Sequence, residues 1–190
     1  GLEAVTDPSA MFLADRRLDV PGSVVVPTIE GRRPLLVEVQ ALASPTGAPQ
    51  PRRSAQGVDP GRVGMLLAVL ATHLQINVAT VDVFTLAVGG ARVTEPGADL
   101  PLALAILSSV RGHPVPARMV ACGEVGLAGE LRSVEGMERR LGEAARHGFT
   151  AAVVPASTPE VDLPIEVLRV PSLDAAALLL GLWDVPHPRF

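Results

Sequence analysis

The chain has 190 residues, a formal net charge of −4 and a hydrophobic content of 48%. These values are typical of one larger globular domain and exclude intrinsic disorder. All sixteen basic residues are arginine, so no lysine can form a Schiff base or serve as a general base. A single cysteine, Cys122, excludes a disulfide framework and a cysteine zinc site and favours a cytoplasmic protein. The apolar runs are shorter than the roughly 20 residues of a membrane helix, so no membrane partner is expected.

Turn residues and apolar periodicity divide the first eighty residues into a hairpin, a loop and a helix. Glycine and two arginines at 31–33 separate the hairpin strands, and Pro27 in the first strand predicts a sheet edge or a bulge. The expected elements are, in order, a lead-in over 1–20 with a short helix capped by Asp7, strands 22–30 and 34–43, a polar loop over 44–58, and a helix from Asp59-Pro60 to about Gln75.

The stretch from Val81 to Ser109 organises the rest of the chain. Residues 81–88 alternate so that one face is small and the other bulky, which predicts a buried strand. Gly89-Gly90 then allows a turn, and apolar residues at helical spacing predict a helix over 98–109. A strand, a glycine turn and a buried helix in this order would hold residues 97–99 rigidly at a helix start. Enzymes place nucleophiles, and binding proteins place anion contacts, on such turns.

The second half of the chain alternates strands and helices. The expected elements are a strand over 119–124, a hairpin over 125–134, a helix over 135–147 ended by Gly148, strands 151–155 and 165–170, a helix from Ser172 through Leu182, and a frayed tail from Trp183 to Phe190. Two early hairpin strands followed by alternating helices and strands predict a two-layer α/β domain.

The order of these elements is similar to that of the Lon-protease proteolytic domain, which has the ribosomal S5 domain 2-like fold. In that family a strand leads to a glycine-proline-serine turn that carries the nucleophile, and a second segment brings a lysine base. Strand 81–88 and helix 98–109 match the first segment. CGEV at 122–125 and GELRSV at 129–134 match the second.

Longer phrases resemble the C-terminal domain of a family of bacterial DNA-repair ATPases, the RadA (Sms) family. They are PGSVVVPTIEGRRPLLVEVQAL at 21–42, PRRSAQGVDPGR at 51–62, VGGARVTEPGADLPLALAI at 88–106 and CGEVGLAGELRSV at 122–134. The resemblance implies a lead-in from an ATPase domain over 1–20, a Lon-like domain over 21–183 and a tail over 184–190. It implies no cofactor in this fragment, and ATP, magnesium and zinc in a missing N-terminal part.

Neither partner of a Ser–Lys peptidase dyad is present at the matching positions. Alignment places Ala98 or Asp99 at the serine and Glu138 at the lysine, so we expect no peptidase activity. Asp99 and Glu138 would be neighbours if the cleft geometry persists, although capping of the helix also accounts for Asp99. The four histidines lack the spacing of a metal site, and Cys122 is expected to be a buried small hydrophobe.

Arginine pairs supply the remaining candidates for binding. Arg52, Arg53, Arg62 and Arg92 are predicted to contact DNA or a neighbouring subunit, because guanidinium groups bind phosphate by a two-pronged fork. The net charge of −4 is not that of a strong nucleic-acid binder. A ring, which the resemblance implies, would sum six modest patches facing one pore into a positive field.

We therefore expect a non-catalytic Lon-like domain that organises a homo-hexamer and helps to hold DNA, single-stranded in our prediction, during recombinational repair and branch migration. Recombination proteins are further candidate partners. Two alternatives stay open: an active Lon-type serine peptidase with another nucleophile, and a pure oligomerisation module that touches no DNA.

Overall fold

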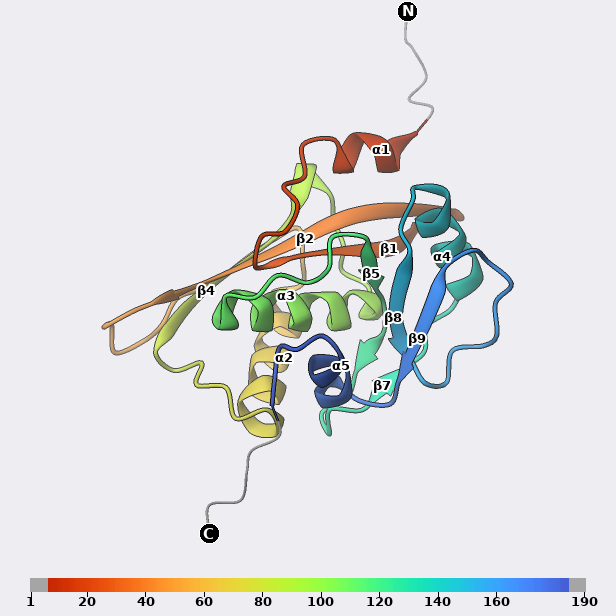
Figure 1. Cartoon of the computed structure of the whole chain (residues 1–190). Helices are drawn as coiled ribbons and strands as arrows, with labels where there is room; N and C mark the ends of the chain where they lie inside the picture. The colour runs from red at the N-terminus through yellow and green to blue at the C-terminus, as the bar shows by residue number, and fades with distance from the viewer. Residues whose placement is uncertain (1–6, 185–190) are drawn as a thin grey trace, which may run out of the picture.

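One mixed sheet forms the centre of the molecule in a computed structural model that describes residues 7–184 (Figure 1). Its seven strands lie in the order β3-β4-β2-β1-β5-β8-β9. The β1–β2 and β2–β4 pairs are antiparallel, and the remaining neighbours are parallel. The strands are β1 (Ser23–Glu30), β2 (Arg33–Pro45), β3 (Arg53–Gln56), β4 (Val81–Ala87), β5 (Met119–Ala121), β8 (Ala151–Pro155) and β9 (Glu166–Val170), and a separate hairpin pairs β6 (Glu124–Val125) with β7 (Leu131–Arg132).

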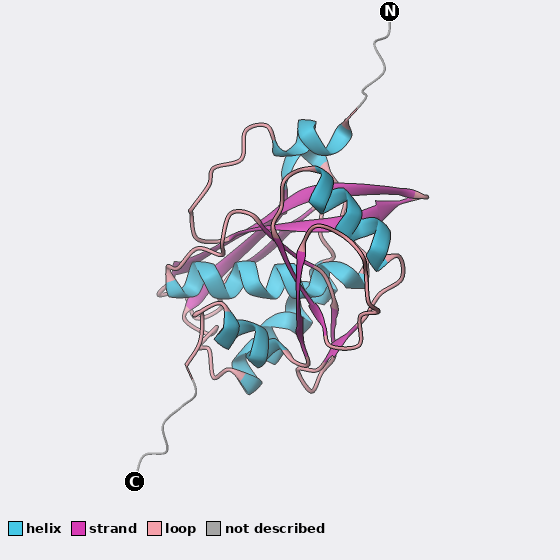
Figure 2. Ribbon diagram, turned by 45° about the vertical axis from the view of Figure 1, so that its right-hand side comes forward, coloured by secondary structure: helices cyan, strands magenta, loops and turns pink. Residues whose placement is uncertain are grey.

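Helices cover both faces of this sheet, so the α/β class is confirmed but the two-layer prediction is wrong (Figure 2). Successive residues of β1 point to opposite faces, and Val24 and Val25 are both fully buried. Val24 packs in the core with the central helices, whereas Val25 packs in a second core with Leu141. The helices are α1 (Pro8–Leu13), α2 (Pro60–His73), α3 (Asp99–Arg111), α4 (Met137–Arg146) and α5 (Leu173–Leu179), with short 3-10 turns η1 (Val88–Gly90) and η2 (Pro96–Ala98).

Most predicted boundaries are confirmed because they depend on local capping chemistry. Side-chain oxygens of Asp7, Asp59 and Ser172 accept hydrogen bonds from the first-turn amides of α1, α2 and α5. Gly148 follows α4 with a φ of 82°, as expected for a left-handed residue after a helix. The prediction that Pro27 marks a sheet edge or a bulge is wrong, because β1 is an interior strand and Pro27 pairs in unbroken register with Leu36 of β2. The missing N–H of Pro27 is tolerated because β1 pairs with β5 at Val25, before Pro27.

Three predictions of individual elements need correction. Residues 44–58 are not all loop, because β2 continues to Pro45 and residues 53–56 form β3 beside β4. The sequence of β3, Arg-Ser-Ala-Gln, has little strand propensity, so pairing with β4 determines its conformation. Strand β4 is buried on one face only, since Phe84 and Leu86 are exposed. The strand predicted over 119–124 is interrupted at residues 122–123.

The frayed tail is also wrong at its first residue. The indole N–H of Trp183 donates to the backbone oxygen of Leu74 at 2.9 Å, and the ring packs against the main core. The rest of that prediction, over 185–190, lies outside the described residues, as do residues 1–6 of the lead-in. Within residues 7–184, no helix combines the length and apolar character that crossing a bilayer requires.

Helix α3 should dominate the stability of the fold because its middle is enclosed on every side. Leu104 in α3 is 0% exposed, so Leu104→Ala should lower the free energy of unfolding by about 2–5 kcal/mol. Leu178→Ala, on the exposed side of α5, serves as the matched control and should change it by no more than about 0.5 kcal/mol. Urea unfolding followed by circular dichroism measures both values, and equal losses would contradict the central place of α3.

Candidate functional site

The turn between β4 and α3, predicted to be the key position, is rigid and sealed. The backbone oxygen of Gly97 accepts a hydrogen bond from Gly123 N at 3.0 Å, and Gly123 O in turn accepts one from Leu100 N at 3.0 Å. A Cβ atom at Gly97 would lie only 3.1 Å from the sulfur of Cys122. Ala98 is 1% exposed. Residues 97–99 therefore have the rigidity of a nucleophile-bearing turn, but none of them presents a reactive side chain to solvent.

Asp99 is fully buried and directs its carboxylate at an arginine from another helix. Arg62 Nε donates to Oδ1 at 2.6 Å, and Arg62 Nη2 donates to Oδ2 at 2.5 Å. The backbone N–H of Val125 also donates to Oδ2, at 3.1 Å. Capping does not explain Asp99, because its side chain makes no capping bond to α3. The residue instead joins α2, α3 and β6 through one carboxylate.

This bidentate pair stabilises the charged form of Arg62. The hydrogen bond to Asp99 raises the pKa of the Arg62 guanidinium, and Glu124 lies 3.8 Å from Arg62 Nη2 as a second anion. A carboxylate held by two guanidinium hydrogen bonds and one amide is a poor base and a poor nucleophile, since its lone pairs are engaged. The geometry stabilises structure rather than proton transfer.

Glu138 and Asp99 differ in burial, because Asp99 is fully buried and Glu138 is exposed. Glu138 is exposed at the start of α4, where it lines a shallow cavity with Ser133, Ser157 and Glu160. The cavity lining contains neither Ala98 nor Asp99. The hydrogen-bond partners of the Asp99 carboxylate are Arg62 and Val125, and no hydrogen bond joins it to Glu138 within residues 7–184, so the two carboxyl groups do not form an acid–base pair.

A second buried ion pair lies behind the turn. The guanidinium of Arg140, on α4, forms a two-pronged salt bridge with Glu95, with Nη2 to Oε2 at 3.0 Å. Burial, the largest single influence, lowers the pKa of Arg140, but the hydrogen bond and charge of Glu95 together with the contact to Cys122 outweigh burial and raise it. Arg140 also donates to the backbone oxygen of Pro27 and contacts the sulfur of Cys122.

Cys122 is fully enclosed, as predicted for a buried hydrophobe. Burial raises the pKa of its thiol to about 12, because nothing around it stabilises a thiolate enough to offset the loss of water. The thiol is therefore a poor nucleophile.

The four arginines selected from the sequence do not form one cluster. Arg62 is committed to Asp99. The guanidinium of Arg53 is exposed but donates to backbone oxygens of Val78 and Val81, where it braces the start of β4. Arg52 and Arg92 are exposed, and the guanidinium group of neither makes a hydrogen bond or salt bridge within the range 7–184.

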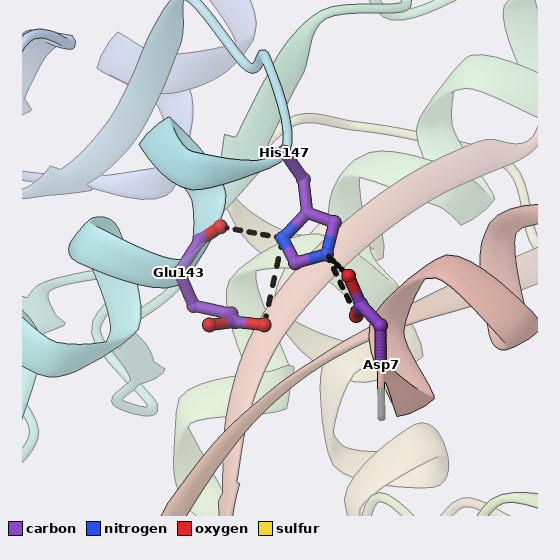
Figure 3. A group of neighbouring side chains, drawn as sticks. All are labelled: Asp7, Glu143 and His147. Carbon is purple, nitrogen blue, oxygen red and sulfur yellow. Dashed lines mark hydrogen bonds and ion pairs between the residues drawn. The ribbon is translucent and has the colours of Figure 1, made fainter. Parts of the chain in front are cut away.

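Sequence reasoning missed a polar cluster that joins α1 to α4 (Figure 3). His147 Nε2 lies 2.9 and 3.0 Å from the two carboxylate oxygens of Asp7, and Nδ1 lies 2.9 Å from the backbone oxygen of Glu143. Ser9 Oγ donates to Glu143 at 2.9 Å. The backbone N–H of Ala10 and then His147 lower the pKa of Asp7. The spacing of Glu143 and His147, four apart on one helix, was the available signal, but Asp7 is 140 residues away.

Asp7, Glu143 and His147 carry side-chain atoms of the types that ligate metals, and these atoms lie within 4.8 Å of one another. Arg146 opposes a cation there, because its Nη2 lies 2.8 Å from Glu143 and its Nη1 lies 3.8 Å from Asp7. The contacts also have ordinary hydrogen-bond lengths. The cluster is best explained as a fastening of α1 to α4.

The fold and its sealed centre define an α/β domain built around buried ion pairs, without a poised nucleophile among residues 7–184. Its sequence is 47% identical to the DNA repair protein RadA of Mycolicibacterium smegmatis over 93% of this chain and 38% of that relative. It is 49% identical to RadA of Escherichia coli over 83% of this chain and 34% of the relative, and 42% identical to RadA of Halalkalibacterium halodurans over 95% and 40%. A family model described as subunit ChlI of Mg-chelatase matches residues 67–158.

The chain is homologous to these RadA proteins over most of its own length. It spans little more than a third of the length of these curated relatives.

Loss of Arg62 should be the most damaging single change at this centre. Arg62→Ala leaves the Asp99 carboxylate buried with one amide donor, so the free energy of unfolding should fall by about 3–5 kcal/mol. Arg53→Ala is the control. It should lower the free energy of unfolding by about 1 kcal/mol or less, because the guanidinium that it removes is exposed and donates only to backbone oxygens. Chemical denaturation measures both, and similar losses would show that the buried pair has no special weight.

The enclosure of Cys122 gives a separate prediction. A disulfide reagent such as dithiobis(nitrobenzoate) should not react with the native protein at pH 8. The thiol is inaccessible, and this pH lies far below its pKa. Stoichiometric release of thionitrobenzoate should appear only after denaturation. Rapid reaction of the folded protein would contradict the sealed centre.

Proposed function

We propose that this domain is the non-catalytic, Lon-like part of a RadA-type DNA repair ATPase, with the ribosomal S5 domain 2-like fold. It acts as a scaffold for a homo-hexamer and as a platform that holds single-stranded DNA during recombinational repair and branch migration. ATP, magnesium and zinc belong, in this proposal, to parts of the longer protein outside this chain, and recombination proteins are further partners. The proposed site of action is the cytoplasm.

The observation that carries the proposal is the extended identity to proteins named DNA repair protein RadA, 47% over 93% of the chain. The sealed turn supports the non-catalytic part. Asp99 is engaged by Arg62, Glu138 lies on the surface, and Cys122 is protonated at neutral pH. These three facts argue against a working peptidase that uses the positions of the Lon dyad.

Binding of DNA is the function that a direct measurement can test. Fluorescence anisotropy with a labelled single-stranded oligonucleotide should show binding that weakens as salt rises, because arginine–phosphate contacts release counterions. Arg52→Ala/Arg92→Ala should weaken it severalfold. The control Arg33→Ala/Arg111→Ala removes the same charge from two other exposed arginines and should have a smaller effect.

The alternatives give different results in the same set of experiments. Light scattering of the wild-type chain that shows a ring without any DNA binding would support the pure oligomerisation module. Turnover of casein that Asp99→Asn or Glu138→Gln abolishes would support the peptidase. Either result would overturn the proposed function.

A further inference from the structure

One face of the sheet is left open where strands β3, β4 and β2 lie side by side. Figure 1 shows α4 towards the right of the view, with β2 and β4 extending to its left. Helices α2 and α3 cover the opposite face of these strands. On the open face Leu42 is 60% exposed, Phe84 37% and Leu86 38%. Large apolar side chains at adjacent sheet positions are unusual on a free surface and mark a contact site.

Strand pairing arranges these side chains in two rungs across three strands. Phe84 pairs with Leu42 on one side and with Ser54 on the other. Leu86 pairs with Gln40 and with Gln56 in the same way. Each rung therefore has an apolar centre, and polar side chains that can both donate and accept hydrogen bonds lie beside it. Residues of both rungs line one surface cavity of about 600 Å³.

Phe84 is the exposed aromatic side chain among residues 7–184. Phe12 and Trp183 are half-buried, and Phe149 is buried. An aromatic ring on an open sheet face is the usual stacking platform for an unpaired base, and each stacked base contributes about 1–3 kcal/mol. Amides and hydroxyls beside the ring suit the edges of bases, which also donate and accept.

Charge at the borders of this face also fits a phosphate backbone. Arg17 lines the cavity, and Arg52 lies at the start of β3, where its backbone N–H donates to Asp82 of β4 at 2.6 Å. Both guanidinium groups are exposed and make no hydrogen bond or salt bridge within the range 7–184. Asp15 and Asp82 are the carboxylates at the same borders.

We propose that the open face of β3, β4 and β2 binds single-stranded DNA, with a base stacked on Phe84 and phosphates held by Arg17 and Arg52. The proposal rests on the proposed function and gives it a surface. It also assigns Arg52, but not Arg53 or Arg62, to the DNA, because the guanidinium groups of the latter two are occupied within the domain.

Substitutions at Phe84 separate base stacking from a general apolar contact. Anisotropy with labelled oligothymidine measures the affinity of each variant. The wild type and Phe84→Trp should bind more tightly than Phe84→Leu and Phe84→Ala. Phe84→Ala and Phe84→Leu should each weaken binding by about tenfold or more, and Phe84→Trp should retain it. The new indole should also lose fluorescence on adding DNA, measured against the wild type with its own Trp183. Leu178→Ala, which removes an exposed apolar side chain on α5, is the matched control and should bind normally.

Arg17→Ala adds an independent readout. Loss of one phosphate contact should reduce the slope of log K against log salt by about 0.7 for a single strand. Circular dichroism and urea midpoints should be unchanged for these surface variants, so that a loss of affinity is not a loss of fold.

Three results would overturn the proposal. Normal binding by Phe84→Ala and Phe84→Leu would remove the platform but leave DNA binding, and hence the proposed function, intact. A different pattern would assign the face to a contact between protein chains. In it, Phe84→Ala binds weakly and has a lower mass by light scattering than the wild type, whereas Phe84→Leu binds normally. A wild-type chain that binds no DNA at low salt would overturn both proposals.

Discussion

The burial of one carboxylate is the constraint on which the centre of this domain depends. Asp99 has no access to water, so three donors from α2 and β6 must take the place of its hydration. These hydrogen bonds to Asp99 fix the start of α3, the first turn of α2 and the hairpin after Cys122 relative to one another. The Arg140–Glu95 ion pair likewise joins α4 to the segment that precedes α3.

These two pairs show how the acidic side chains at a rigid turn are engaged in structural contacts. A catalytic group needs an accessible lone pair or proton and a partner whose pKa is close to the working pH. Here the acids are matched with arginines, which stay protonated, and the one thiol is buried without a base. The preorganisation that would serve a reaction instead stabilises the packing of α2, α3 and α4.

Local signals in the sequence predicted much of the fold. The caps at Asp59 and Ser172 and the apolar stripe of α3 follow from short-range chemistry. Strand β3 could not be predicted, because its residues become a strand only beside β4. The partners of Asp99 were equally hidden, since Arg62 lies 37 positions earlier. For the same reason the sequence could not tell which arginines are occupied within the domain and which face solvent.

The fastening of α1 has a mechanical consequence. Asp7 contacts His147, and Ser9 contacts both Glu143 and the backbone N–H of Leu36 in β2. A pull on the chain at Asp7 is thus shared at once between the end of α4 and an interior strand. Such a load shears several contacts together instead of peeling them one at a time. Tension applied at Asp7 would therefore rotate the domain as a rigid body before it unfolded α1.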